Sequence, residues 1–253
     1  MNIVALVRRF TVEQWVAIDA EYRDPSTKTD AKGIGVLVLA GVLLTIKRYY
    51  GRTRGFRILF GGMANDWPIP GIWPYLYGTF ASLILHFLIP SLFIYFIFRE
   101  GIQDHGFRIK GIGRYKWLYL AMFLVVLPTV IFASRWPSFI RKYPLYSNAG
   151  NSWTEFLIWE TAYGLYFVAL EFFFRGFMLF TLARYMGAYA IFVMVIPYAM
   201  IHFGKPFAET LGSVIAGAAL GTLALRTRSI FGGVLIHVTI AWAMDISAIV
   251  ARL

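Results

Sequence analysis

Apolar residues in this chain are gathered into long runs, and shorter polar or basic segments separate the runs. The clearest runs carry almost no charge and cover residues 117–134, 186–203 and 230–250. A hydrocarbon core about 30 Å thick is crossed by about 20 apolar residues of α-helix. The pattern therefore predicts an all-α membrane protein, a multi-pass helical bundle of about seven to eight transmembrane helices.

Four further apolar stretches are expected to cross the membrane as well. They cover residues 33–46, 71–98, 153–183 and 209–225. The first is short for a crossing, and the third is expected to form one long helix. Pro90 is expected to kink the second, because proline removes a backbone donor from the helix.

These runs divide the chain into three parts. We expect residues 1–32 to form a polar or interfacial segment, residues 33–134 accessory transmembrane helices, and residues 150–250 a helical core with the candidate chemistry. Residues 2–20 could lie on the membrane surface as an amphipathic helix, or form a short solvated helix. Residues 135–152 are rich in proline, glycine and asparagine, and are expected to form a loop outside the hydrocarbon.

Composition and charge support a membrane location. Hydrophobic residues make up 59% of the chain and charged residues 15%, whereas a soluble domain has about 25% charged residues. The net charge is +11, and basic residues concentrate in the connections 47–70 and 99–116. This placement favours contact with anionic lipid headgroups, so membrane lipid is an expected partner and nucleic acid is not. The chain has no cysteine, which excludes disulfides and cysteine-based sites.

The same charges leave two interpretations of membrane orientation open. Both basic connections flank the single apolar run 71–98. Either this run is a hairpin broken near Pro90, or one connection departs from the rule that basic loops stay on the cytoplasmic side.

Ionisable residues inside the last crossings are the strongest functional signal. A charged side chain within a membrane span costs about 2.5–3.5 kcal/mol or more, so such groups are usually paired or functional. Glu171 and Arg175 are four residues apart, so on an α-helix they share a face and can form an ion pair, structural or functional. His202 ends the next run and His237 lies in the last one. Together, glutamate and histidine can hold and deprotonate a water molecule.

Three further carboxylates are weaker candidates. Glu209 begins a predicted helix, where a carboxylate favours the positive end of the helix dipole. Asp245 follows His237 by eight residues, on nearly the same side of the helix. Glu160 precedes Glu171 by three turns, about 16 Å, which is too far for shared chemistry and closer to the expected membrane boundary.

Three segments of the core resemble the motifs of a known family. LEFFFRGFMLF, then YAMIH, then IFGGVLIH, are similar in order and spacing to the motifs of the CAAX-protease and bacteriocin-processing family of intramembrane endopeptidases. That family has a Glu-Glu pair followed by three residues and an arginine, an aromatic residue four positions before a histidine, and a histidine four positions before Asn or Asp. Two positions differ here, because Leu170 replaces the first glutamate and Ala241 replaces the Asn or Asp.

The resemblance implies roles for the matching residues. Glu171 would be the base that activates water together with His202, His237 would stabilise the oxyanion, and Arg175 would orient Glu171. Asp245 or Glu209 would supply the polar group that is missing. No cofactor is expected; a zinc ion is the alternative, and it would be held by Glu171, His202 and His237.

The resulting hypothesis is an intramembrane endopeptidase that cleaves a peptide or protein with a membrane-associated tail. One alternative is a catalytically inactive relative that acts as a membrane scaffold or immunity protein, motivated by Leu170. Another is a proton-coupled transporter that uses the same ionisable groups. A bacterial inner membrane is the expected location. The sequence indicates neither an oligomeric state nor the identity of the substrate.

Overall fold

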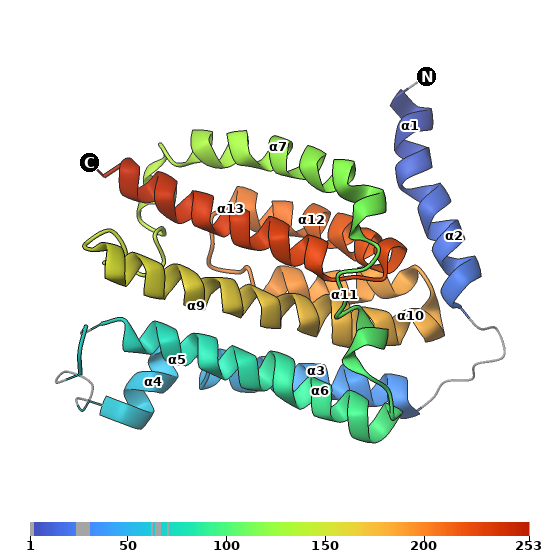
Figure 1. Cartoon of the computed structure of the whole chain (residues 1–253), viewed down its shortest axis with the longest axis horizontal. Coiled ribbons are helices and arrows are strands. Elements are labelled where there is room, and N and C mark those ends of the chain that lie inside the picture. The colour runs from blue at the N-terminus through green and yellow to red at the C-terminus, as the bar shows by residue number, and fades with distance from the viewer. Residues whose placement is uncertain (1–2, 24–30, 62, 64–66, 70, 253) are drawn as a thin grey trace. The chain divides into compact units, whose positions relative to one another are not determined.

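A computed structural model describes residues 3–23, 31–61, 63, 67–69 and 71–252 of the chain (Figure 1). These residues form helices, turns and loops, and none of them lies in a strand, as expected for the all-α class. The chain folds as two units that interleave along the sequence. Unit 1 comprises residues 1–40, 91–115 and 172–232, and unit 2 comprises residues 41–90, 116–171 and 233–253.

Unit 1 contains the N-terminal helices and most helices that follow the first family motif. Its elements are α1 (Ile3–Phe10), α2 (Val12–Tyr22), the π-helix η3 (Ile94–Phe98), the 3₁₀-helices η4 (Ile102–His105) and η5 (Ile112–Tyr115), the π-helix η6 (Phe172–Phe180), α10 (Thr181–Met186), α11 (Tyr189–Met200) and α12 (Phe207–Thr227). Helix α11 packs along α12. Gly217 of α12 permits this approach, because a Cβ atom there would lie 3.0 Å from the ring of Tyr198.

Unit 2 contains two long helices that carry buried carboxylates. Its elements are α4 (Thr53–Phe60), α5 (Trp73–Ser82), the π-helix η2 (Leu83–Leu88), α7 (Lys116–Ala133), α8 (Pro137–Ile140), α9 (Trp153–Glu171) and most of α13 (Phe231–Val250). A cluster of Val130, Phe139, Tyr143 and Ala248 packs α7 and α8 against α13. Helices α3 (Ala31–Tyr49) and α6 (Ile89–Phe93) begin in one unit and end in the other.

Within the described residues, five helices are long and apolar enough to cross a membrane. They cover Trp73–Phe98, Ile112–Ala133, Trp153–Met186, Phe207–Thr227 and Phe231–Val250. The expected count of seven to eight is therefore not confirmed. Helix α3 covers the expected crossing 33–46 but carries Lys32, Lys47 and Arg48 near its ends, and α11 has only 12 residues.

The run around Pro90 is one helical segment, so the hairpin interpretation is wrong. Helical structure continues from Trp73 to Phe98, with π-helical turns over Leu83–Leu88 directly before the short helix that contains Pro90. A π-turn takes up the backbone groups that a proline leaves unmatched in an α-helix. One of the two basic connections must then depart from the positive-inside rule if this segment spans the membrane.

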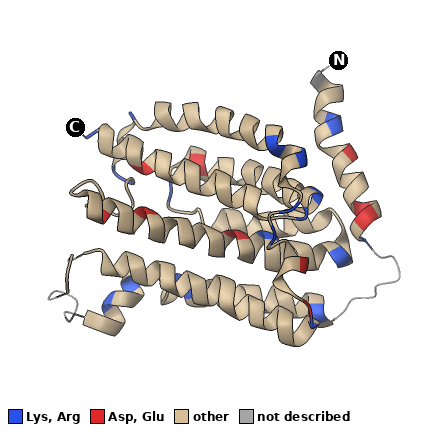
Figure 2. Cartoon of the chain, in the orientation of Figure 1, with Lys and Arg blue, Asp and Glu red and all other residues tan. Residues whose placement is uncertain are grey.

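Charged side chains avoid the middle of the spanning helices with a few exceptions. Figure 2 shows α7 tan along its length except for basic residues at its start, where Arg114 and Lys116 lie. Acidic residues interrupt α9 and α13 instead. On these two helices the carboxylates of Glu160, Glu171 and Asp245 are all buried.

Candidate functional site

Glu171 and His237 form a buried acid–base pair within unit 2. Glu171 is the last residue of α9, and His237 lies in the first half of α13. The Nδ1 atom of His237 is 2.6 Å from Oε1 of Glu171. The glutamate side chain is fully buried, whereas the histidine side chain is 17% exposed. The histidine is therefore the member of the pair with exposed surface.

Two neighbours fix the geometry of this pair. The ring of Phe167, one helical turn before Glu171, stacks on the His237 ring with the two planes 7° apart and the centroids at 5.3 Å. Gly233, one turn before His237, faces the carboxylate, and a Cβ atom there would lie 2.2 Å from Oε2 of Glu171. Because no side chain tolerates that distance, glycine at this position is what lets the carboxylate approach α13.

Arg175 lies in unit 1, in a π-helical segment. It belongs to the π-helix η6, whose hydrogen bonds run from residue i to i+5. A spacing of four residues also keeps two side chains on nearly one face in a π-turn, so the pairing of Glu171 with Arg175 stays a prediction. The guanidinium is fully buried and lies 4.2 Å above the ring centroid of Tyr198. A cation over an aromatic face is attracted by the negative ring surface.

Tyr198 also positions His202 within unit 1. The backbone carbonyl of Tyr198 lies 2.8 Å from Nδ1 of His202, and the two rings make an edge contact at 4.8 Å. A carbonyl oxygen only accepts hydrogen bonds, so Nδ1 must donate, and the neutral ring then carries its lone pair on Nε2. Arg175, Tyr198 and His202 thus form a second group of candidate residues, ordered around one aromatic ring.

The two supporting candidates have local partners. Glu209 lies in the first turn of α12, as its dipole argument predicts, and its Oε1 accepts from Nζ of Lys205 at 2.7 Å. Asp245 accepts from the indole Nε1 of Trp159 at 2.7 Å. Both contacts hold helix ends or helix pairs in place.

Apolar side chains occupy the two positions at which this chain departs from the family pattern. Leu170 and Ala241 are both buried. The positions where the family has a glutamate and an Asn or Asp therefore carry no polar group in this chain.

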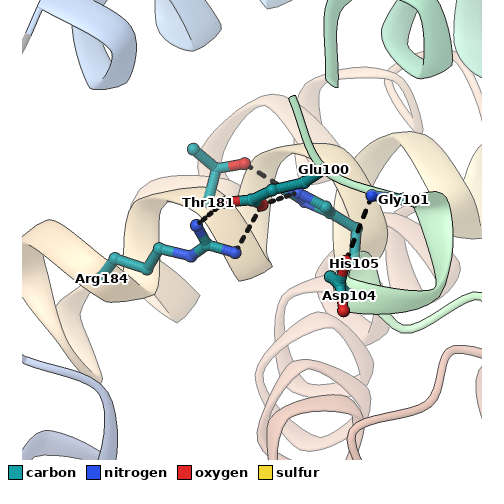
Figure 3. A network of polar contacts seen from close by, with 6 residues as sticks. All are labelled: Glu100, Gly101, Asp104, His105, Thr181 and Arg184. Carbon is teal, nitrogen blue, oxygen red and sulfur yellow. Dashed lines mark hydrogen bonds and ion pairs between the residues drawn. The ribbon is translucent and has the colours of Figure 1, made fainter. Parts of the chain in front are cut away.

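Sequence reasoning missed a polar network in unit 1 (Figure 3). Arg184 donates from both terminal nitrogens to the carboxylate of Glu100, at 2.6 and 2.8 Å. The buried His105 lies 2.9 Å from the same carboxylate through Nε2, and its Nδ1 is 3.4 Å from the Thr181 hydroxyl. Glu100 and Arg184 are 84 residues apart, so no local spacing could have paired them.

The charges in this network shift two pKa values. Burial alone would raise the pKa of Glu100, but the hydrogen-bonded guanidinium of Arg184 outweighs burial and holds it below its ordinary value. Burial lowers the pKa of His105, and the opposing effect of Glu100 does not restore it. The histidine is therefore neutral at physiological pH and donates from Nε2 to Glu100.

The donors of the zinc alternative belong to both units, because Glu171 and His237 lie in unit 2 and His202 in unit 1. A catalytic zinc needs three protein ligands, and the described part of the chain holds no group of three or more His, Asp or Glu side chains that could bind one. Within unit 2, Glu171 and His237 supply two donors.

The fold defines an integral membrane protein with helical spans. Residues 151–243 match the family model described as Type II CAAX prenyl endopeptidase Rce1-like. This match confirms the resemblance inferred from the motifs and includes the four main candidates. Asp245 lies two residues beyond its end. Searches of curated proteins and of solved structures found no match.

Proposed function

We propose that the chain is an intramembrane endopeptidase and that Glu171 and His237 form its acid–base pair. The observation that carries this proposal is the 2.6 Å contact between the two side chains, inside the segment that matches the endopeptidase family. A carboxylate next to an imidazole is the arrangement that proteins use to hold one tautomer and stabilise the protonated ring.

The difference in exposure between His237 and Glu171 supports different roles for the two side chains. His237 is the partly exposed member, so its Nε2 takes a proton from water while the oxygen attacks the peptide carbonyl. The fully buried Glu171 holds Nδ1 protonated and stabilises the imidazolium that forms. The proton then passes to the leaving amine as the peptide bond breaks. This differs from the roles implied by the resemblance, in which Glu171 was the base and His237 the oxyanion donor.

His202 and Arg175 take supporting roles in the proposal. Because Nδ1 of His202 donates to the Tyr198 carbonyl, its Nε2 can accept a hydrogen bond from a water molecule or a substrate group. Arg175 is buried on the Tyr198 ring, so it acts as a positioning residue. Glu209 and Asp245 are engaged with Lys205 and Trp159 and keep structural roles.

The substrate class follows from the family description. A prenyl endopeptidase acts on a polypeptide whose tail is held at the membrane, so we propose a peptide or protein with a membrane-associated tail as substrate. The test uses the full chain in proteoliposomes. Its probes are two internally quenched peptides of one sequence, one ending in a prenylated cysteine tail and one without lipid.

The expected result is cleavage by the wild type and loss of about 10²–10⁴-fold in Glu171→Gln and His237→Gln, the usual contribution of acid–base catalysis. Glu160→Gln is the matched control, because it changes a buried carboxylate on the same helix outside the pair, and it should keep full activity. Wild-type rates in Glu171→Gln would refute the assignment.

A second candidate is a catalytically inactive relative that binds such peptides. The buried Leu170 and Ala241, which leave two motif positions without a polar group, favour it. It predicts that the wild type binds the labelled peptides but cleaves neither, and that Glu171→Gln binds them equally well.

A further inference from the structure

Residues 3–22 contain two helices with different surroundings. Helix α1 (Ile3–Phe10) ends one residue before α2 (Val12–Tyr22) begins. The residue between them, Thr11, donates from its hydroxyl to the carbonyl of Val7 at 2.7 Å. The two helices can therefore have separate roles.

Helix α2 is fastened to the rest of unit 1 by polar contacts along one face. Trp15 donates to the Thr222 hydroxyl at 3.2 Å, and the Tyr22 hydroxyl donates to the Leu225 carbonyl at 2.9 Å. The Asp19 carboxylate accepts from the backbone N–H of Ala188 at 2.7 Å. These bonds hold α2 on α12 and on the start of α11.

Helix α1 instead exposes an apolar face. Val4, Val7 and Phe10 are 71%, 54% and 47% exposed, and Leu6 is exposed as well. With 3.6 residues per turn, these side chains occupy one half of the helix, and Arg8, Arg9 and Ala5 occupy the other. An exposed apolar face beside basic residues is typical of a helix that lies in a membrane interface.

We propose that α1 lies in the headgroup region of an anionic bilayer, with its apolar face toward the acyl chains and Arg8 and Arg9 on lipid phosphates. The family match and the five apolar helices place a bilayer next to this chain. Charge complementarity favours lipid over a second copy of the chain. Anionic headgroups would neutralise Arg8 and Arg9, whereas a second copy of α1, which has no acidic residue, offers them no carboxylate.

The test labels single cysteines in the full chain, which has no native cysteine to remove. A nitroxide at Val7→Cys reports the apolar face, and one at Ala5→Cys reports the opposite face. The protein is reconstituted in nanodiscs of phosphatidylcholine alone or with phosphatidylglycerol. Collision with oxygen, which enters lipid, is compared with collision with a water-soluble nickel complex.

With phosphatidylglycerol, the Val7→Cys label should be accessible to oxygen and shielded from nickel, and the Ala5→Cys label should show the reverse. Changing Arg8 and Arg9 to Gln should shift the Val7→Cys label toward nickel access. Changing Arg54 and Arg57, two exposed arginines of α4, to Gln removes the same charge and should leave the label where it was.

Three outcomes would overturn the proposal. Nickel access at both positions in both lipids would make α1 a solvated helix. Spin–spin broadening with shielding at Val7→Cys would indicate a second copy of the chain. Shielding that does not depend on phosphatidylglycerol or on Arg8 and Arg9 would exclude binding to anionic headgroups.

Discussion

Two glutamate–histidine pairs in this protein use the same chemical groups in opposite ways. In the Glu171–His237 pair of unit 2 the carboxylate is fully buried and the histidine partly exposed. In the Glu100–His105 pair of unit 1 the histidine is fully buried and the carboxylate is 26% exposed. Arg184 also neutralises Glu100 through two hydrogen bonds. The first arrangement leaves the histidine ring partly exposed and the second buries it, which suits the first pair to the acid–base role proposed for it.

The largest expected effect comes from pushing the first pair apart without changing either member. Gly233→Ala would place a methyl group 2.2 Å from the buried Oε2 of Glu171, so the carboxylate must move. A displacement of about 1 Å in a catalytic group can cost about 10²-fold in rate. Peptide cleavage in proteoliposomes measures this loss.

Gly164→Ala is the matched control for that substitution. An added Cβ there would meet the Val238 side chain at 3.8 Å, an ordinary contact, and alanine favours the helix. This variant should cleave at the wild-type rate. Equal rates for both variants would mean that the Glu171–His237 contact does not determine activity.

The Glu100–His105 pair should affect the stability of the folded protein rather than the rate of peptide cleavage. Because the folded pKa of His105 is lowered, the folded state binds fewer protons than the unfolded state as pH falls below the ordinary value of 6.5. The free energy of unfolding therefore decreases as pH falls from 6.5 toward the lowered pKa of His105. Below 4.5 the lowered pKa of Glu100 has the same consequence, since its ion pair is lost as pH falls through the folded pKa. Thermal unfolding in detergent from about pH 8 down to about pH 4, which covers the onset of both effects, should show a falling midpoint.

The histidine contribution is separated by His105→Gln. This variant should flatten the decline between pH 6.5, the ordinary value, and the onset of the Glu100 effect. It should leave the lower-pH decline in place, because Arg184 still pairs with Glu100. An unchanged profile would show that another group controls acid stability.

The smallest effect is expected at the ring beneath Arg175. Tyr198→Phe keeps the aromatic face under the guanidinium and the backbone carbonyl that orients His202, and cation–π attraction needs only the ring. Activity should stay within a few-fold of the wild type, whereas Tyr198→Leu should lower it clearly. If both variants behaved alike, the ring would have no positioning role.

The sequence predicts the helical class and most apolar helices, because a helix that crosses lipid requires a long run of apolar residues with few charges. It also singles out Glu171 and His237, since charged groups in such runs are conspicuous. It does not predict that these two lie against each other. That partnership depends on Gly233 and Phe167, whose importance follows only from the packing of α9 and α13.

The number of membrane crossings that the sequence predicts is not confirmed, and the contacts of Glu100 are not predicted from the sequence. Helix α3 is apolar over residues 33–46. The lysines and the arginine near its ends make it too charged to count among the five candidate membrane spans. Arg184 reads as an ordinary basic residue at a helix end, and only tertiary structure brings Glu100 and His105 to it.

The π-helix η6 has a consequence for how this chain can change in length. A π-turn closes its hydrogen bonds over one residue more than an α-turn, so the nine residues from Phe172 to Phe180 hold more chain than an α-helix of the same height. A single deletion there can be absorbed by a change to α-helical bonding. The same deletion inside α9 would turn every later side chain by about 100°, so η6 is a place where the chain can lose a residue and still keep both helix ends in register.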